Sequence, residues 1–107
     1  MKRFLSIGEC MVELADIGEG RYRRGFAGDT FNAAWYARRS LPGDWQVNYF
    51  TAVGDEAISQ HMLDFMEDHG VSTSFVRRIA GRMPGLYMIE LKNGERSFAY
   101  WRDTSAA

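Results

Sequence analysis

The sequence lacks the features on which several classes of protein depend. Its single cysteine excludes an intramolecular disulfide and offers too few thiols for a zinc ribbon, which is typical of a reducing compartment. Only a short apolar stretch separates Lys2 and Arg3 from Gly8, so we expect neither a signal peptide nor a membrane span. The net charge of -1 gives no overall attraction to nucleic acid or to an anionic membrane. We therefore expect a cytoplasmic protein with no nucleic-acid or membrane partner.

Motifs that bind nucleotide phosphates are also lacking. No Gly-x-x-x-x-Gly-Lys-Ser/Thr loop occurs, and Gly18-Glu19-Gly20 is not followed by the third glycine of a dinucleotide fingerprint. The sequence stops at Ala107 without such a segment. We therefore expect this chain to be the substrate-binding part of something larger.

The composition that remains is that of a globular domain. A chain of 107 residues, 46% apolar and 14% aromatic, is one domain or part of one. Its basic residues are mostly arginine, which favours bidentate recognition of carboxylate or phosphate. The arginine pairs lie on different predicted elements and are balanced by acidic residues, so a solvated surface is favoured over a nucleic-acid site: Arg23-Arg24, Arg38-Arg39 and Arg77-Arg78.

Residue patterns predict strands and helices in alternation, followed by a run of strands. We expect strands at Arg3–Ile7, Cys10–Leu14, Tyr22–Phe26, Trp45–Val53, Phe75–Ile79, Gly85–Leu91 and Arg96–Trp101. Helical spacing predicts one helix over Thr30–Ser40, capped by Asp29 or Thr30, and a second that ends at Gly70. Asp16–Gly20 is turn-like, and Asn93-Gly94 predicts a hairpin.

This order predicts α/β layers with an accessory antiparallel element. The two long strands joined by the first helix are expected to be parallel and to need more neighbours than this chain supplies.

The candidate binding site begins at a glycine turn that leads into the first helix. In Gly28-Asp29-Thr30-Phe31-Asn32, the small residue allows a ligand to approach the backbone, and the side chains of Asp29 and Asn32 can face a polyol. The alternative is structural, with Asp29 as a helix cap and Asn32 on the surface.

Other candidates have ordinary structural explanations. His69, near the end of the second helix, suits the helix dipole, and Cys10 is expected to be a buried apolar residue. Glu9 and Glu13 flank the first strand and could form a carboxylate pair for acid and base chemistry.

An ordered series of motifs carries a resemblance to a known family. Gly8-Glu9-Cys10-Met11-Val12-Glu13-Leu14, Gly28-Asp29-Thr30-Phe31-Asn32-Ala33, Val53-Gly54-Asp55 and Pro84-Gly85-Leu86-Tyr87 through Tyr100-Trp101-Arg102 resemble the bacterial 2-keto-3-deoxygluconate kinases. These belong to the PfkB-type, ribokinase-like sugar kinases, and the resemblance covers essentially the whole chain.

The resemblance implies the N-terminal part of a ribokinase-like three-layer α/β/α domain with a small antiparallel β lid. Core strands and helices would occupy about residues 1–79, and lid strands about 10–26 and 84–102. The implied activity is ATP-dependent phosphorylation of 2-keto-3-deoxygluconate to its 6-phosphate. The implied substrate contacts are Gly28, Asp29, Asn32, Tyr87, Tyr100 and Arg102.

The resemblance also implies what this chain does not supply. Asp29 imitates the family's catalytic aspartate but matches the substrate signature, so no catalytic base is assigned. Sites for ATP and Mg would lie in a missing C-terminal part. The alternatives are a truncated sugar-binding or subunit-interaction fragment that pairs through lid strands, or a PfkB-type kinase for another sugar. Tyr87 and Tyr100 could also serve only as cross-strand packing.

Overall fold

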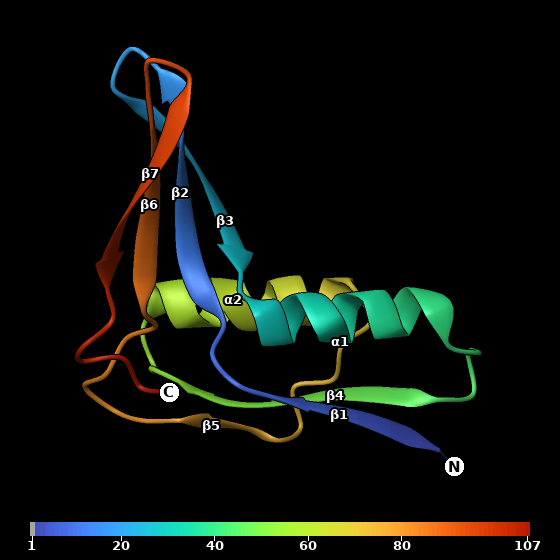
Figure 1. Cartoon of the computed structure of the whole chain (residues 1–107). Helices are drawn as coiled ribbons and strands as arrows, with labels where there is room; N and C mark the ends of the chain where they lie inside the picture. Colours follow the sequence, from blue (N-terminus) through green and yellow to red (C-terminus); the bar gives the residue numbers. More distant parts are fainter. Residues whose placement is uncertain (1) are drawn as a thin grey trace.

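The structure is a computed structural model in which residues 2–107 are described (Figure 1). It confirms the α/β class. The elements in chain order are β1 (Arg3–Ile7), β2 (Met11–Gly18), β3 (Arg21–Ala27), α1 (Asp29–Ser40), β4 (Gln46–Val53), α2 (Ala57–Asp68), β5 (Val76–Arg78), β6 (Leu86–Lys92) and β7 (Glu95–Trp101).

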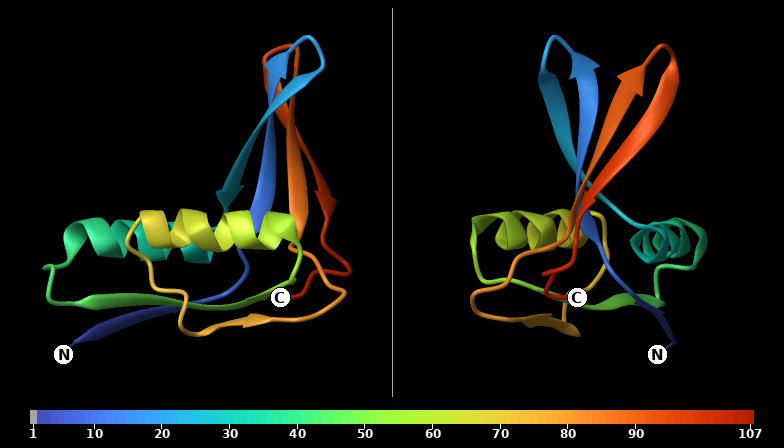
Figure 2. Two further views of the ribbon diagram at one scale, coloured as in Figure 1. Left: turned by 180° about the vertical axis from the view of Figure 1, so that it is seen from behind. Right: turned by 60° about the vertical axis from the view of Figure 1, so that its left-hand side comes forward.

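A parallel sheet in the order β1-β4-β5, here called the core sheet, forms the base of the molecule. Both helices cover the same face of it (Figures 1 and 2). Phe31 of α1 meets Tyr49 of β4 edge to face, with ring centroids 5.7 Å apart. The buried core is completed by apolar residues from both helices and β4: Ala34, Val47, Val53, Met62 and Met66. The parallel pairing of β1 with β4 across α1 is confirmed.

No described element covers the opposite face of the core sheet. Leu5, Ile7 and Phe50 project there with exposed fractions of 47%, 62% and 45%. Because their neighbours Ser6 and Tyr49 are buried on the helical side, β1 and β4 carry large side chains toward both faces. This is the pattern of strands that are buried on two sides.

Helix α1 begins differently from the prediction. Its N-cap is Gly28, whose carbonyl accepts the backbone N–H of Asn32 at 2.8 Å, and no side chain caps the helix. Asp29 lies in the first turn, where a negative charge favours the helix dipole. The Thr30 hydroxyl is instead 2.7 Å from the Tyr49 hydroxyl. The predicted cap at Asp29 or Thr30 is therefore wrong, because Thr30 is engaged with the core sheet.

Helix α2 follows the predicted amphipathic pattern. Met62 and Met66 are fully buried, whereas Gln60 and Asp64 are exposed and joined by a hydrogen bond of 2.9 Å. The helix ends at His69, followed by Gly70 with φ of 77°, a left-handed conformation that favours glycine. The predicted C-terminal signal is confirmed.

A second sheet, here called the upper sheet, has the order β3-β2-β6-β7 and stands above one end of the helices (Figure 1). It consists of two antiparallel hairpins, β2-β3 and β6-β7, which diverge toward their tips (Figure 2, right). The central pair, β2 with β6, is parallel, so the expected all-antiparallel lid is instead mixed. Both β2 and β6 are the first strands of their hairpins and run in the same direction, so their pairing is parallel.

The turns of the two hairpins differ in how well the sequence predicted them. Asn93 and Gly94, at φ of 53° and 79°, form the predicted turn between β6 and β7. The predicted turn at Asp16–Gly20 is too long, because β2 continues to Gly18. Asp16 Oδ1 accepts the Gly18 N–H at 2.8 Å across a register shift, and the strand passes through this irregularity.

The upper sheet rests on the second helix through aromatic contacts. Phe26 of β3 lies 5.4 Å from Phe65 of α2 between ring centroids, and Phe65 in turn lies 5.7 Å from Phe31. A continuous aromatic row therefore joins the upper sheet to the core.

Neither described helix combines the length and apolar character needed to cross a bilayer.

Candidate functional site

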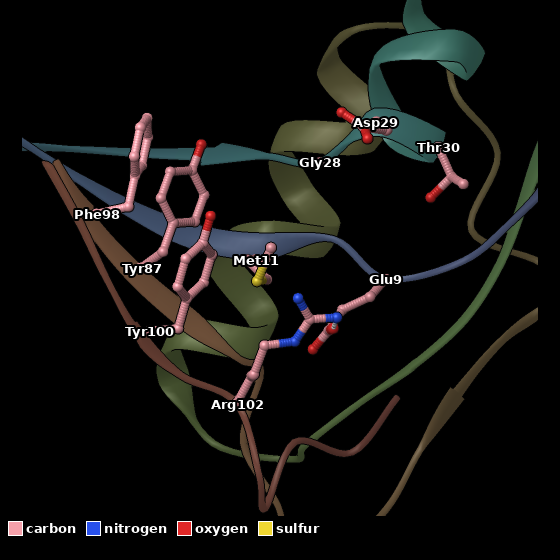
Figure 3. Close-up of a pocket in the computed structure, with 9 residues that line it drawn as sticks. All are labelled: Glu9, Met11, Gly28, Asp29, Thr30, Tyr87, Phe98, Tyr100 and Arg102. Atoms are coloured by element: carbon pink, nitrogen blue, oxygen red, sulfur yellow. Dashed lines mark ion pairs between the residues drawn. The ribbon is translucent and has the colours of Figure 1, made fainter. Parts of the chain in front are cut away.

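A cavity of about 420 Å³ opens between the upper sheet and the start of α1 (Figure 3). Its walls come from the chain after β1, the first residues of β2, the turn into α1, and the paired strands β6 and β7. The lining residues are Glu9, Met11, Gly28, Asp29, Thr30, Tyr87, Phe98, Tyr100 and Arg102.

Strand register explains why aromatic side chains form one wall of the cavity. Tyr87 and Tyr100 are directly paired across β6 and β7, and Phe98 lies two residues before Tyr100, on the same face. The Tyr87 and Tyr100 rings stack at 5.9 Å, and the Phe98 and Tyr100 rings at 6.4 Å. The predicted cross-strand packing therefore occurs on the face that lines the cavity, so it does not compete with a binding role. Ring faces and hydroxyls together suit a ligand that has both apolar and polar surfaces.

The opposite wall is the turn into α1. A Cβ added at Gly28 would lie 2.5 Å from the carbonyl oxygen of Glu9, so only glycine allows the chain after β1 to pass so close. Asp29 follows at the rim with an exposed carboxylate (Figure 3). This wall thus offers helix N–H groups and one negative charge.

The positive charge in the cavity comes from Arg102, which follows β7. Its Nη2 lies 3.0 Å from Oε1 of Glu9, and the two side chains are 52% and 16% exposed. The other carboxylate oxygen of Glu9, Oε2, is buried without a hydrogen-bond partner in the described structure.

Tyr87 also has an acidic partner. Glu13 lies directly opposite it across the parallel pair β2 and β6, and the Tyr87 hydroxyl donates to Glu13 Oε2. Burial, together with this carboxylate, raises the pKa of Tyr87 above its usual range. The hypothesis that Glu9 and Glu13 form a carboxylate pair is wrong, because one carboxylate is bound to Arg102 and the other to Tyr87.

Five of the six site residues predicted from the sequence line the cavity, and one does not. Gly28 and Asp29 form one wall, and Tyr87, Tyr100 and Arg102 form the other. Asn32 lies one turn into α1, is exposed, and is not among the lining residues.

Four lining residues did not enter the predicted site. Phe98 could have been found from strand alternation, since it lies two residues before Tyr100 on the same face of β7. Met11 joins this face through the pairing of β2 with β6, which local alternation does not predict. Thr30 adjoins Gly28-Asp29. No sequence signal indicated that Glu9 would meet Arg102.

The two histidines and the cysteine lie away from the cavity lining. His61 Nδ1 is 3.3 Å from Arg24 Nη1 at the exposed side of α2, and His69 Nδ1 is 2.8 Å from the Phe65 carbonyl at the helix end. Cys10 is buried as expected, and burial, with a smaller contribution from Glu9, raises the pKa of its thiol to about 12. Across residues 2–107, no three His, Cys, Asp or Glu side chains converge as metal ligands.

Comparison with known proteins places this site in context. The family model described as pfkB family carbohydrate kinase matches residues 1–107. The chain is 45% identical to a 2-dehydro-3-deoxygluconokinase of Escherichia coli K12, with 99% of this chain and 35% of that protein covered. It is 43% identical to the protein of that name from Dickeya dadantii, over 99% of this chain and 34% of that protein. The chain therefore spans about a third of the length of these curated relatives.

Solved structures give the same fold. A fructokinase from Vibrio cholerae superposes with a TM-score of 0.83 at 26% identity, covering 99% of this chain and 36% of that chain. A 2-dehydro-3-deoxygluconokinase from Thermotoga maritima also scores 0.83, at 21% identity, covering 99% and 34%. A fructokinase from Xylella fastidiosa, described with bound ATP, scores 0.83 at 24% identity, covering 97% and 31%.

Proposed function

Because the chain belongs to the pfkB family of carbohydrate kinases, we propose that it forms the sugar-binding part of an ATP-dependent kinase for 2-keto-3-deoxygluconate, which is also called 2-dehydro-3-deoxygluconate. The full protein would transfer a phosphoryl group to the 6-hydroxyl of this sugar acid. The names of its relatives, 40% to 45% identical over 99% or more of this chain, support the substrate.

One observation in the site carries the proposal: Arg102 stands in the same cavity as a wall of tyrosines. Its guanidinium can hold a carboxylate by parallel hydrogen bonds, while Tyr100 and Asp29 can bond to the hydroxyls of the same ligand. A neutral sugar would use the tyrosines and Asp29 but would offer the arginine only hydroxyl oxygens and no negative charge. This combination favours a sugar acid.

We assign the cavity residues to binding and not to phosphoryl transfer. Transfer requires donors around the γ-phosphate, a metal that bridges phosphates, and a positioned base. The lining residues supply a single cation, which is already paired with Glu9. We propose that ATP and Mg bind in the part of the full-length protein outside these residues, in a cytoplasmic enzyme.

In this proposal the upper sheet is the lid over the sugar, with lid strands at about 10–26 and 84–102 on a core of about 1–79. The arrangement in Figure 1 supports it, because the cavity lies where the upper sheet meets α1. Gly28, Asp29, Tyr87, Tyr100 and Arg102 would be substrate contacts. Asn32 would reach the sugar only if the lid or the ligand extended farther along α1.

The test is Arg102→Ala in the full-length protein. Loss of a charged hydrogen-bond pair costs about 1.5 to 3 kcal/mol, so we expect KM for the keto acid to rise by about ten- to a hundredfold. KM for a neutral sugar substrate should change little. Arg102→Lys is the matched control, because it keeps the positive charge but loses the planar guanidinium. Its KM for the keto acid should lie between those of the unaltered protein and Arg102→Ala. Faster turnover of fructose or ribose than of the keto acid by the unaltered protein would reject the substrate and retain the kinase class.

A second candidate follows from the edges of the upper sheet. Strands β3 and β7 each pair on one side only within the described structure, and open edges can pair with another chain. The chain would then act as a non-catalytic sugar-binding or subunit-interaction fragment, including a homo-oligomer formed through lid strands. Light scattering of the 107-residue chain tests this candidate, because a dimer or larger assembly would support pairing through the strand edges and a monomer would contradict it.

A further inference from the structure

Glu9 occupies the joint between the two sheets. It lies in the short connection from β1 of the core sheet to β2 of the upper sheet. Its partner Arg102 directly follows β7, the last strand of the upper sheet. The ion pair therefore links the segment that enters the upper sheet to the segment that leaves it.

Two glycines make room for Glu9. A Cβ on Gly85 would lie 2.6 Å from Glu9 Oε2 and 3.1 Å from Arg102 Cβ. Gly85 is not in the left-handed region, so the space beside it, and not its backbone conformation, is what requires glycine there. A Cβ on Gly28 would likewise lie 2.5 Å from the backbone carbonyl oxygen of Glu9. Glu9 is thus held at both its backbone and its carboxylate.

The ion pair leaves most of the guanidinium available. Only Nη2 of Arg102 contacts Glu9, through Oε1 at 3.0 Å, and no side-chain hydrogen bond of Nη1 or Nε occurs in the described structure. A free arginine side chain with half its surface exposed would sample many rotamers. Bound to a carboxylate that is itself enclosed, it presents a fixed edge to the cavity (Figure 3).

We propose that Glu9 is a positioning residue for Arg102 and through it determines the selectivity of the pocket for carboxylate-bearing sugars. This inference rests on the proposed function. Glu9 does not touch the ligand. It fixes the guanidinium before the ligand arrives, so that the ligand does not bear the full entropy cost of ordering a long side chain.

Glu9 also has an effect that opposes binding of the acid. Its negative charge neutralises Arg102 and repels an incoming carboxylate. If this effect dominated, removal of Glu9 would tighten binding of the acid. Positioning and repulsion therefore predict opposite changes for the same substitution.

The experiment compares Glu9→Ala, Glu9→Gln, Arg102→Ala and the double variant in the full-length protein. Steady-state kinetics are measured with the keto acid and with a neutral sugar. Glu90→Ala is the matched control. Glu90 is an exposed carboxylate three residues after Tyr87 in β6, so it lies on the opposite face of the strand from Tyr87. Thermal melting accompanies each variant.

We expect Glu9→Ala to raise KM for the acid about tenfold, the size that ordering one long side chain can account for, with little change in kcat or in KM for the neutral sugar. Glu9→Gln should stay within about threefold, because the amide oxygen still accepts from Nη2. The double variant should be no worse than Arg102→Ala, which shows that Glu9 acts through Arg102.

Three results would overturn the inference: a lower KM for the acid in Glu9→Ala, equal losses for both substrates, or additive losses in the double variant. If Glu9→Ala melts far below the unaltered protein, kinetics are measured below its melting range, where a loss confined to the acid supports positioning and an equal loss for both substrates overturns it. Failure of the proposed function is separate, because it shows in the unaltered protein as no preference for the acid.

Discussion

The two sheets of this molecule are stabilised in different ways. The core sheet is held by side chains packed between strands and helices, among them Tyr49, Met62 and Met66 with no exposed surface. The upper sheet is held by backbone pairing and two tight turns, and it leaves large aromatics such as Tyr100 54% exposed. Buried side chains therefore stabilise the core sheet, whereas the upper sheet exposes the aromatics of the proposed binding site, so substitutions should separate the two.

The largest effect on stability should come from Met62→Ala in the core. Removing a fully buried methionine costs about 2 to 5 kcal/mol. Tyr100→Ala, in the upper sheet, should cost about 1 kcal/mol or less, because its ring is half exposed. Urea unfolding monitored by circular dichroism measures both.

Ligand binding should show the reverse order. Tyr100→Ala removes a stacked ring and a hydroxyl from the cavity, so binding of the keto acid should weaken about tenfold, whereas Met62→Ala should leave it unchanged below the melting range. If Tyr100→Ala proved as destabilising as Met62→Ala, the distinction between the two sheets would be lost.

An intermediate effect is expected at Cys10, which lies where the two sheets join. Burial raises the pKa of the folded thiol from its ordinary value of 9.0 to about 12, so the unfolded chain loses the thiol proton first as the pH rises. The protonated thiol of Cys10 therefore contributes fully to the free energy of unfolding below about pH 9. This contribution is lost between about pH 9 and pH 12, at about 1.4 kcal/mol per pH unit.

The measurement is urea unfolding between about pH 8 and pH 10, with Cys10→Ala as control, since the raised pKa values of Tyr49 and Tyr87 act in the same direction at higher pH. The unaltered chain should lose about 1 kcal/mol more than the variant over this range. Equal slopes, or rapid reaction of the folded thiol with iodoacetamide at pH 8, would show that Cys10 is not enclosed at the joint.

The smallest effect should come from the turns of the upper sheet. Gly94→Ala places a Cβ in open space at φ of 79°, so only backbone strain acts, at about 1 kcal/mol. Gly25→Ala, in β3, also meets open space, but without a positive φ, and should be neutral. Melting temperatures of the pair test this, and equal losses would mean that the turn conformation is not what Gly94 supplies.

Local features were predictable from the sequence, and distant pairings were not. β1, the Asn93-Gly94 hairpin and the end of α2 depend on neighbouring residues, and each was predicted correctly. The parallel pairing of β2 with β6 joins residues 74 positions apart, as Glu13 and Tyr87 show. No local pattern encodes such a pairing.

The same limit applied to the site. Gly28, Asp29, Tyr87, Tyr100 and Arg102 were predicted because their motifs resemble those of a known family, and all five line the cavity. The cap of α1 was misassigned because Thr30 bonds to Tyr49, which lies in another element. The contact of Glu9 was not predicted for the same reason, since its partner Arg102 lies near the other end of the chain.

The parallel junction of β2 and β6 also constrains the order of folding. Each hairpin can close by itself, within the microseconds typical of local strand pairs. The junction must wait until α1, β4, α2 and β5, which lie between its strands in the sequence, have brought their ends together. The cavity spans that junction, so it does not exist in any partly folded chain. Binding of a ligand in this cavity would therefore be a late signal that folding of these residues is complete.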